Sequence, residues 1–171
     1  MDSIWTKTFT IRKRASLKGD IRADVAVIGG GMTGILTAWQ LKQAGVRAVV
    51  LEADRIGGGQ TGNTTAKVTS QHGMFCHTFI ENKGEETARK YVQANQAAVE
   101  EYKKIIREKG ISCDLRECDS YVYSADGDTL AKEVEAAKKL GVDVVLENQI
   151  SLPVSCAGTV CFHGQAEFHP L

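Results

Sequence analysis

A run of glycines between two apolar segments most constrains how this 171-residue chain can fold. Residues 25–28, Val-Ala-Val-Ile, are rich in β-branched side chains, which is typical of a parallel strand buried on both faces. Three glycines at 29–31 interrupt this run, a helical pattern follows, and a second apolar run ends at Glu52. The succession predicts strand, turn, helix and strand over residues 23–53, which is a parallel βαβ unit.

The glycines and the acid of this unit fit the binding of a dinucleotide. Gly29 permits a sharp exit from the strand, Gly31 lets backbone approach a pyrophosphate, and Gly34 lets the helix pack closely on the sheet. The unpaired amides at the helix start, from Met32 onward, would face the phosphates. Glu52 stands 23 residues after Gly29, where an acid can accept a hydrogen bond from a ribose hydroxyl. A glycine triplet alone would indicate only a turn.

Composition excludes several classes of protein. The chain is 43% hydrophobic and 25% charged, which is typical of a globular protein. Its 21 basic and 21 acidic residues balance, so no charge pattern for nucleic acid or an anionic membrane is present. We find no apolar segment of membrane-spanning length and no signal-peptide core, and we expect a cytoplasmic protein. Five cysteines without framework spacing are expected to be reduced.

The segment that follows Glu52 is a second candidate for ligand contact. Residues 54–68 contain four glycines and five side chains with a hydroxyl or amide group. Such a segment can present N–H and hydroxyl groups to an anionic or ring-shaped ligand, although a plain flexible loop looks similar. Its position directly after the acid favours ligand contact.

Two groups of potential metal ligands are incomplete. His72, Cys76 and His77 lie close together but lack the spacing of a tetrahedral ligand set. Cys161-Phe162-His163 is half of an iron–sulfur ligand set of the Rieske kind, and the Cys-x-x-His half is absent. We therefore predict no metal site.

The remaining elements follow from periodicity and capping. An apolar stripe predicts a long helix over residues 84–109 that Gly110 ends, and we assign the stripe to the core. Residues 120–124 resemble a strand, and a helix capped by Asp128 or Thr129 and ended by Gly141 follows. Residues 142–146 form another strand-like run, and 148–171 are loop-rich with a strand near 159–162.

Three stretches resemble a known family. Residues 29–34, 51–54 and especially 61–73 are similar to the FAD-dependent oxidoreductases of the D-amino-acid oxidase and glycine oxidase superfamily. The likeness covers about residues 18–171 and is greatest to a bacterial branch whose full-length members often carry a C-terminal Rieske domain. The fold class expected is α/β, with a Rossmann-like FAD/NAD(P)-binding βαβ unit and part of an α+β substrate domain.

The resemblance implies a set of FAD contacts. The pyrophosphate would lie over the glycine turn and helix start, the adenosine ribose on the acid, and the later loop would reach the isoalloxazine. The implied residues are Gly29, Gly31, Met32, Thr33, Gly34, Glu52, Ala53, Asp54, Thr61, Gly62, Asn63, Thr64, Thr65, Ala66 and Lys67. The family's loop usually has more glycine or serine where this chain has residues 63–65, so backbone contact is better supported there than side-chain contact.

The resemblance also implies an activity and a domain plan. Family members oxidise the C–H bond beside an amine nitrogen of an amine or amino acid by passing hydride to flavin, which oxygen or another acceptor reoxidises. We expect an arm at 1–22, an FAD-binding part at 23–110 and the start of a substrate domain at 111–171. Catalytic residues are not assigned. An NAD-dependent dehydrogenase and a non-catalytic fragment remain alternatives, because the βαβ unit alone does not separate them.

The C-terminal residues generate a first prediction. His169-Pro170-Leu171 places a proline where a helix would begin, so the chain looks cut. We expect residues 1–171 alone to bind FAD weakly or not at all, to turn over no amine, and to self-associate through an uncovered sheet edge. FAD titration and light scattering test this expectation, and a monomer that holds stoichiometric flavin would contradict it.

Overall fold

A computed structural model describes residues 3–148 and 153–171 and divides them between two compact units. The first unit comprises the chain up to Ala66 together with His169–Leu171, and the second comprises Lys67–Phe168. The first is an α/β unit and the second an α+β unit, so the expected fold class is confirmed. Each unit is described by itself.

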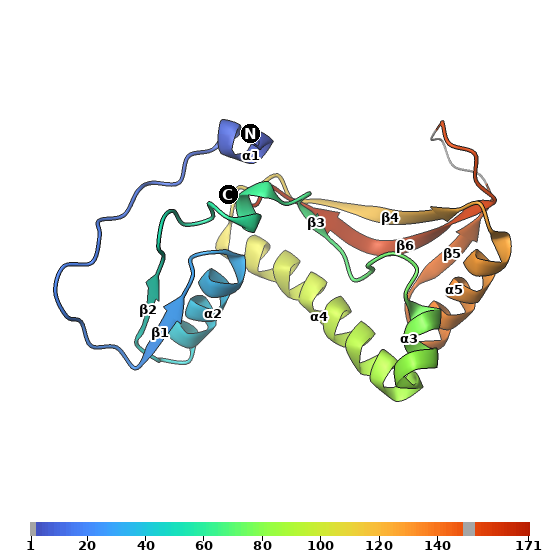
Figure 1. Ribbon diagram of the computed structural model, residues 1–171, viewed down its shortest axis with the longest axis horizontal. Coiled ribbons are helices and arrows are strands. Elements are labelled where there is room, and N and C mark those ends of the chain that lie inside the picture. The colour runs from blue at the N-terminus through green and yellow to red at the C-terminus, as the bar shows by residue number, and fades with distance from the viewer. Residues whose placement is uncertain (1–2, 149–152) are drawn as a thin grey trace. The chain divides into compact units, whose positions relative to one another are not determined.

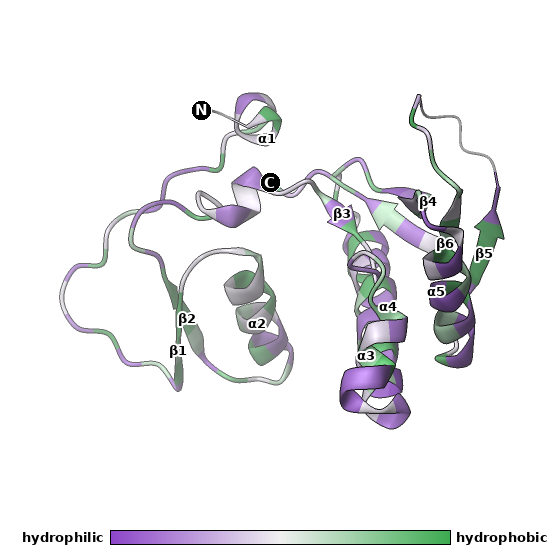
Figure 2. Ribbon diagram, turned by 45° about the vertical axis from the view of Figure 1, so that its right-hand side comes forward, coloured by the Kyte–Doolittle hydropathy of each residue, from purple (hydrophilic) through white to green (hydrophobic). Residues whose placement is uncertain are grey.

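The first unit contains the predicted βαβ arrangement (Figure 1). Strand β1 (Val25–Ile28) and strand β2 (Ala48–Leu51) pair in parallel, and helix α2 (Met32–Gln43) connects them. Both strands consist of hydrophobic residues, as Figure 2 shows. Gly45 follows the helix with φ +75°, a conformation that favours glycine and reverses the chain towards β2.

The N-terminal residues of this unit pack on the loop that follows β2. Helix α1 (Ile4–Thr8) is short, and the loop contains a 3₁₀ turn, η1 (Gln60–Asn63). The indole Nε1 of Trp5 donates a hydrogen bond of 2.8 Å to the carbonyl of Thr64, and the hydroxyl of Ser3 donates to the carbonyl of Gly62. The expected arm therefore includes a helix that fixes the loop.

The second unit is built on an antiparallel sheet. Strand β6 (Gly158–Glu167) is its centre, and strand β4 (Arg116–Ser124) runs along one edge of it. On the other edge, β5 (Val144–Glu147) pairs with the first half of β6 and β3 (Lys67–Val68) with its end. The strand expected near 159–162 is thus confirmed in place, but its length is underestimated, and the loop-rich assignment of this region is wrong for residues 158–167.

Three helices lie on one face of this sheet (Figure 1). They are α3 (Cys76–Lys83), α4 (Glu85–Lys109) and α5 (Gly127–Lys139). The main core gathers buried side chains of α3, α4, α5 and the strands, namely Cys76, Ala88, Val92, Leu130, Val134, Ala136, Ala137, Leu140, Val142, Val144, Val160 and Phe162. The long helix and its end at Gly110, which has φ +60°, are as predicted.

The division between the two units differs from the expected boundary at residue 110. Val99 of α4 packs with Val68 of β3 and Ala166 of β6, so the long helix belongs with the antiparallel sheet. The assignment of 23–110 to FAD binding and of 111–171 to substrate binding stays a prediction about function.

One helix cap also differs from the expectation. Asp126, rather than Asp128 or Thr129, caps α5: its carboxylate accepts hydrogen bonds of 3.0 Å from the Asp128 amide and 3.4 Å from the Thr129 amide. The cap lies two residues before Asp128, so Gly127 and Asp128 belong to the first turn of the helix, where the Asp126 carboxylate satisfies free amides.

The start of α3 has an unusual acceptor. The Glu133 carboxylate of α5 is 1% exposed and accepts hydrogen bonds from the amides of Phe75, Cys76 and His77 at 3.0, 2.8 and 3.0 Å. A buried carboxylate is tolerated only where such donors replace water. Glu133 therefore joins α3 to α5.

We expect Glu133→Ala to lower the free energy of unfolding of the second unit by about 2–4 kcal/mol, because the buried amides would lose their acceptor. Glu135→Ala, at an exposed position of the same helix, should change it by about 0.5 kcal/mol or less. Urea unfolding followed by the near-ultraviolet circular dichroism of the four tyrosines, all in this unit, measures both. Equal losses would contradict the assigned role.

Candidate dinucleotide-binding site

The candidate site is a cleft of about 490 Å³ within the first unit. It is formed by the end of β1, the first turns of α2, the end of β2 and the loop that follows. The lining residues are Val27, Ile28, Gly29, Gly31, Met32, Thr33, Gly34, Thr37, Glu52, Arg55, Gly57, Gly58, Gly59, Gln60 and Thr61.

Close packing of the helix on the strand exit fixes the shape of the turn. A Cβ atom added at Gly34 would lie 2.0 Å from the carbonyl oxygen of Gly29, which no side chain can accept. Gly29 has φ +104°, so the exit from β1 also favours glycine. These contacts support the reasons for which the sequence singles out both positions.

The amino end of α2 has amides that no helical carbonyl satisfies. The first bond of the i to i−4 type runs from the Ile35 amide to the Gly31 carbonyl at 3.0 Å, so the amides of Met32, Thr33 and Gly34 precede it. The Met32 amide donates to the Thr61 hydroxyl at 3.0 Å. Backbone donors and the positive end of the helix dipole thus meet in the cleft, which is the environment that a phosphate requires.

Glu52 connects the end of β2 to the glycine turn. Its Oε2 atom accepts a hydrogen bond of 2.7 Å from the Gly30 amide, and its Oε1 atom accepts one of 3.0 Å from the Asp54 amide. These bonds, the one from Asp54 foremost, lower the pKa of the Glu52 carboxyl, so the group is ionised at neutral pH. A carboxylate has further lone pairs that can accept ribose hydroxyls.

The loop after β2 is held against the glycine turn by backbone contacts. The Gly57 amide donates a bond of 2.9 Å to the carbonyl of Gly30. A Cβ atom at Gly62 would lie 2.6 Å from the carbonyl oxygen of Gly57, so the loop folds tightly on itself. Two side chains bond to the loop's own backbone. The Asn63 amide group donates to the Gly59 carbonyl, and the Thr64 hydroxyl accepts from the Ala66 amide.

The structure brings some of the predicted residues together. The predicted residues that line the cleft are Gly29, Gly31, Met32, Thr33, Gly34, Glu52 and Thr61. Ala53, Asp54 and residues 62–66 do not line it, and Lys67 belongs to strand β3 of the second unit. Arg55 and residues 57–60 also line the cleft. They belong to the glycine-rich segment 54–68 that the sequence offers as a candidate for ligand contact, although none of them is among the individual FAD contacts that the resemblance implies.

Of the potential metal ligands, one group comes together in the part of the chain that the structure describes. It consists of Asp119, Cys161 and His163, in the second unit. His72, Cys76 and His77 do not form such a group within residues 3–148 and 153–171. All five cysteines are free, as expected. Among the described residues, we find no helix with the length and apolar character needed to cross a lipid bilayer.

The fold is that of an α/β protein with a Rossmann-like βαβ unit, and comparison with known families specifies it further. The family model described as FAD dependent oxidoreductase (DAO) matches residues 24–171. The chain therefore belongs to the DAO family of FAD-dependent oxidoreductases, which confirms the resemblance seen in its sequence.

The chain is also similar in sequence to individual curated proteins. The protein YhfW of Bacillus subtilis (strain 168), whose name assigns it provisionally to the Rieske 2Fe-2S iron–sulfur proteins, is 38% identical over 99% of this chain and 34% of its own length. Gamma-glutamylputrescine oxidoreductase of Escherichia coli (strain K12) is 29% identical over 91% of this chain and 38% of its own length. The chain thus spans about a third of the length of these curated relatives.

A solved structure has the same fold. L-proline dehydrogenase from P. horikoshii superimposes with a TM-score of 0.68 and 20% identity, over 87% of this chain and 38% of the other. At this identity the likeness supports the fold, which includes a Rossmann-like unit, and carries no information about the substrate.

Gly34→Ala should destabilise the first unit by more than about 3 kcal/mol, because the added Cβ would overlap the Gly29 carbonyl oxygen. In Gly31→Ala the added Cβ would lie 3.4 Å from Thr61 Oγ1, so we expect a loss of about 1 kcal/mol or less. Urea unfolding followed by tryptophan fluorescence reports this unit, since both tryptophans, Trp5 and Trp39, lie in it. Similar losses would show that the close approach at Gly34 does not control stability.

Proposed function

We propose that this chain supplies the FAD-binding N-terminal part of an oxidoreductase that oxidises an amine or amino acid by hydride transfer to flavin. The observation that supports it most is the convergence of the free amides of α2 and the ionised Glu52 carboxylate on one cleft, in a member of an FAD-dependent family. One end of this cleft suits phosphate and the other suits ribose hydroxyls.

The residues of the cleft suit distinct parts of FAD. The amides at Thr33 and Gly34 would bind the pyrophosphate, and Arg55 would add a positive charge beside it. Glu52 would accept hydrogen bonds from the adenosine ribose. Thr61 would keep the Met32 amide as its donor and direct its own hydroxyl hydrogen at a phosphate oxygen. When bound, the flavin supplies the redox chemistry, and the chain's contribution is binding and orientation.

The substrate class is proposed from the family and its members. The E. coli relative carries the name of an amine substrate, gamma-glutamylputrescine. A free amine or amino acid is therefore the class to test first.

An NAD-dependent dehydrogenase is the competing function, since the same βαβ unit binds either dinucleotide. The loop that closes on the glycine turn through Gly57, together with the family match, favours FAD. Calorimetric titration with FAD and with NAD in parallel separates the two. Tighter binding of NAD, or binding of neither by a protein that spans the relatives' full length, would overturn the proposal.

In a protein long enough to hold FAD, Glu52→Ala should weaken FAD binding by roughly tenfold or more, because charge-assisted hydrogen bonds to the ribose are lost. The matched control is Asp54→Ala, which keeps the Asp54 amide that bonds to Glu52 and should leave the affinity nearly unchanged. The melting temperature of each variant must be measured, since Glu52 also holds the Gly30 amide. Unchanged affinity in Glu52→Ala would remove this residue from the site.

Gly31→Val should abolish FAD binding with little loss of fold. The backbone of Gly31 has φ −79° and ψ −178°, which any residue adopts, whereas a branched side chain would occupy the space above the turn that a pyrophosphate needs. Circular dichroism checks the fold and calorimetry the binding. A folded variant that binds FAD as the parent does would place the phosphate site elsewhere.

A further inference from the structure

A β-bulge in the second unit places three metal-binding side chains together. Cys118 of β4 pairs with Gln165 of β6, and Ser120 pairs with Phe162. Between these pairs, β4 has one residue, Asp119, whereas β6 has two, His163 and Gly164. The extra residue makes the bulge, and Gly164 adopts φ +71° within it.

The bulge is fixed by partners outside the sheet ladder. The buried Lys103 of α4 donates a hydrogen bond of 2.7 Å to the carbonyl of Gly164. The side chain of Gln165 donates a hydrogen bond of 2.8 Å to the backbone carbonyl of His163. The backbone amide of His163 donates one of 3.1 Å to the backbone carbonyl of Asp143. The carbonyls of Gly164 and His163 and the amide of His163 therefore have hydrogen-bond partners at the bulge.

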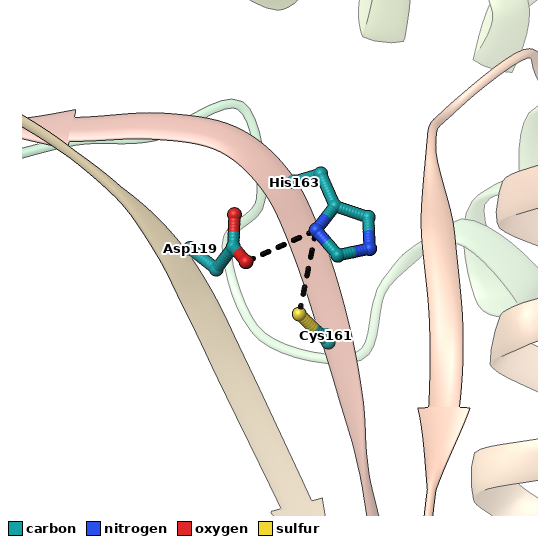
Figure 3. A group of neighbouring side chains, drawn as sticks. All are labelled: Asp119, Cys161 and His163. Carbon is teal, nitrogen blue, oxygen red and sulfur yellow. Dashed lines mark hydrogen bonds and ion pairs between the residues drawn. The ribbon is translucent and has the colours of Figure 1, made fainter.

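The side chains at this bulge converge (Figure 3). Cys161 and His163 lie two residues apart on β6, and Asp119 approaches from β4. The Nδ1 atom of His163 is 3.0 Å from Asp119 Oδ2 and 3.8 Å from Cys161 Sγ. The three donor atoms lie within 4.8 Å of one another.

Hydrogen bonds already connect this group. A neutral imidazole Nδ1 carries either one proton or one lone pair, so it cannot both donate to Asp119 and accept from the Cys161 thiol. The Cys161 side chain also has hydrogen-bond contacts with Tyr121 and Asp119. A cation among the three atoms would replace these bonds and use a lone pair of each ligand atom.

The spacing of the three side chains also fits a cation. In a tetrahedral zinc site, bonds of about 2.0–2.3 Å place neighbouring ligand atoms about 3.3–3.7 Å apart. The observed distances of 3.0 and 3.8 Å bracket this range.

We propose that Asp119, Cys161 and His163 form a binding site for a divalent transition-metal ion with the properties of Zn²⁺, with a fourth position open to water. Binding forms bonds from the metal to the carboxylate, the imidazole Nδ1 and the sulfur, and it releases the thiol proton to solvent; no oxidation or reduction takes place. Such an ion would tie β4 to β6 across the bulge. The proposal is independent of FAD binding.

Cobalt titration of the 171-residue chain tests the site, because Co²⁺ occupies zinc sites and reports its ligands. We expect a thiolate-to-cobalt charge-transfer band and the visible bands of tetrahedral Co²⁺, both saturating at one ion per chain and both removed by added Zn²⁺. Cys161→Ser should abolish the charge-transfer band. His163→Gln and Asp119→Asn, at partly exposed side chains, should each weaken Co²⁺ binding by about tenfold or more.

The matched control is Cys118→Ser, which removes an exposed thiol next to Asp119 on the same strand and should leave the titration unchanged. His77→Gln serves likewise for a histidine outside the group. Circular dichroism verifies that each variant is folded. If Cys161→Ser does not fold, the loss of Co²⁺ binding in His163→Gln and Asp119→Asn tests the proposal instead. A parent chain without the charge-transfer band, a band that survives Cys161→Ser, or losses in the control variants equal to those at the site would each overturn the proposal.

Discussion

The hydrogen bond between the Glu52 carboxylate and the Gly30 amide is the contact on which the first unit depends. It joins the end of β2 to the turn after β1, at 2.7 Å, and so fixes the two strand ends at the edge where α2 begins. The glycine turn can then pass close enough to α2 for Gly34 to lie against the Gly29 carbonyl. Without a carboxylate at this position, the Gly30 amide would need water as its partner, and the cleft would lose one wall.

The second unit depends on two buried charged side chains, Glu133 and Lys103, that form hydrogen bonds with backbone groups of the helices and the sheet. Glu133 accepts the amides that begin α3, and Lys103 donates to the carbonyl that the bulge in β6 frees. Each charge is almost fully buried, which is costly unless hydrogen bonds replace its water. Both lie where regular structure is interrupted, at a helix start and at a bulge, and each supplies the partner that the interrupted backbone needs.

The features that sequence predicts here are those with local causes. The βαβ unit, the long helix and its final glycine each depend on residues within one turn or one strand, and the structure contains all of them. The cap of α5 is missed because Asp126, Asp128 and Thr129 are all residue types that favour an N-cap. Which of them is the cap depends on where the first helical turn begins, and the sequence pattern does not fix that residue. Most of β6 is missed because it is central: its residues are buried on both faces, so the alternation that reveals a strand is absent.

The candidate sites divide in the same way. Glycine and acid positions of the cleft lie within one βαβ unit, so their spacing along the chain predicts their neighbourhood in space. Asp119 and His163 are 44 residues apart, and their contact requires both the pairing of β4 with β6 and a bulge that shifts the register. In the sequence, Cys161 and His163 form only half of a Rieske-type pattern. Asp119, which joins them in space, comes from a neighbouring strand, and only the fold can supply that information.

Thr61 shows how the cleft keeps its shape while remaining able to bind an anion. Its hydroxyl oxygen accepts the Met32 amide at 3.0 Å, so the first amide of α2 has a partner that belongs to the chain itself. A hydroxyl that accepts one bond still has a proton to donate, and the amides of Thr33 and Gly34 have no carbonyl within the helix to compete with a ligand. A phosphate oxygen could therefore add to this arrangement without displacing the bond that holds the loop to the helix, because that bond is made within the chain itself.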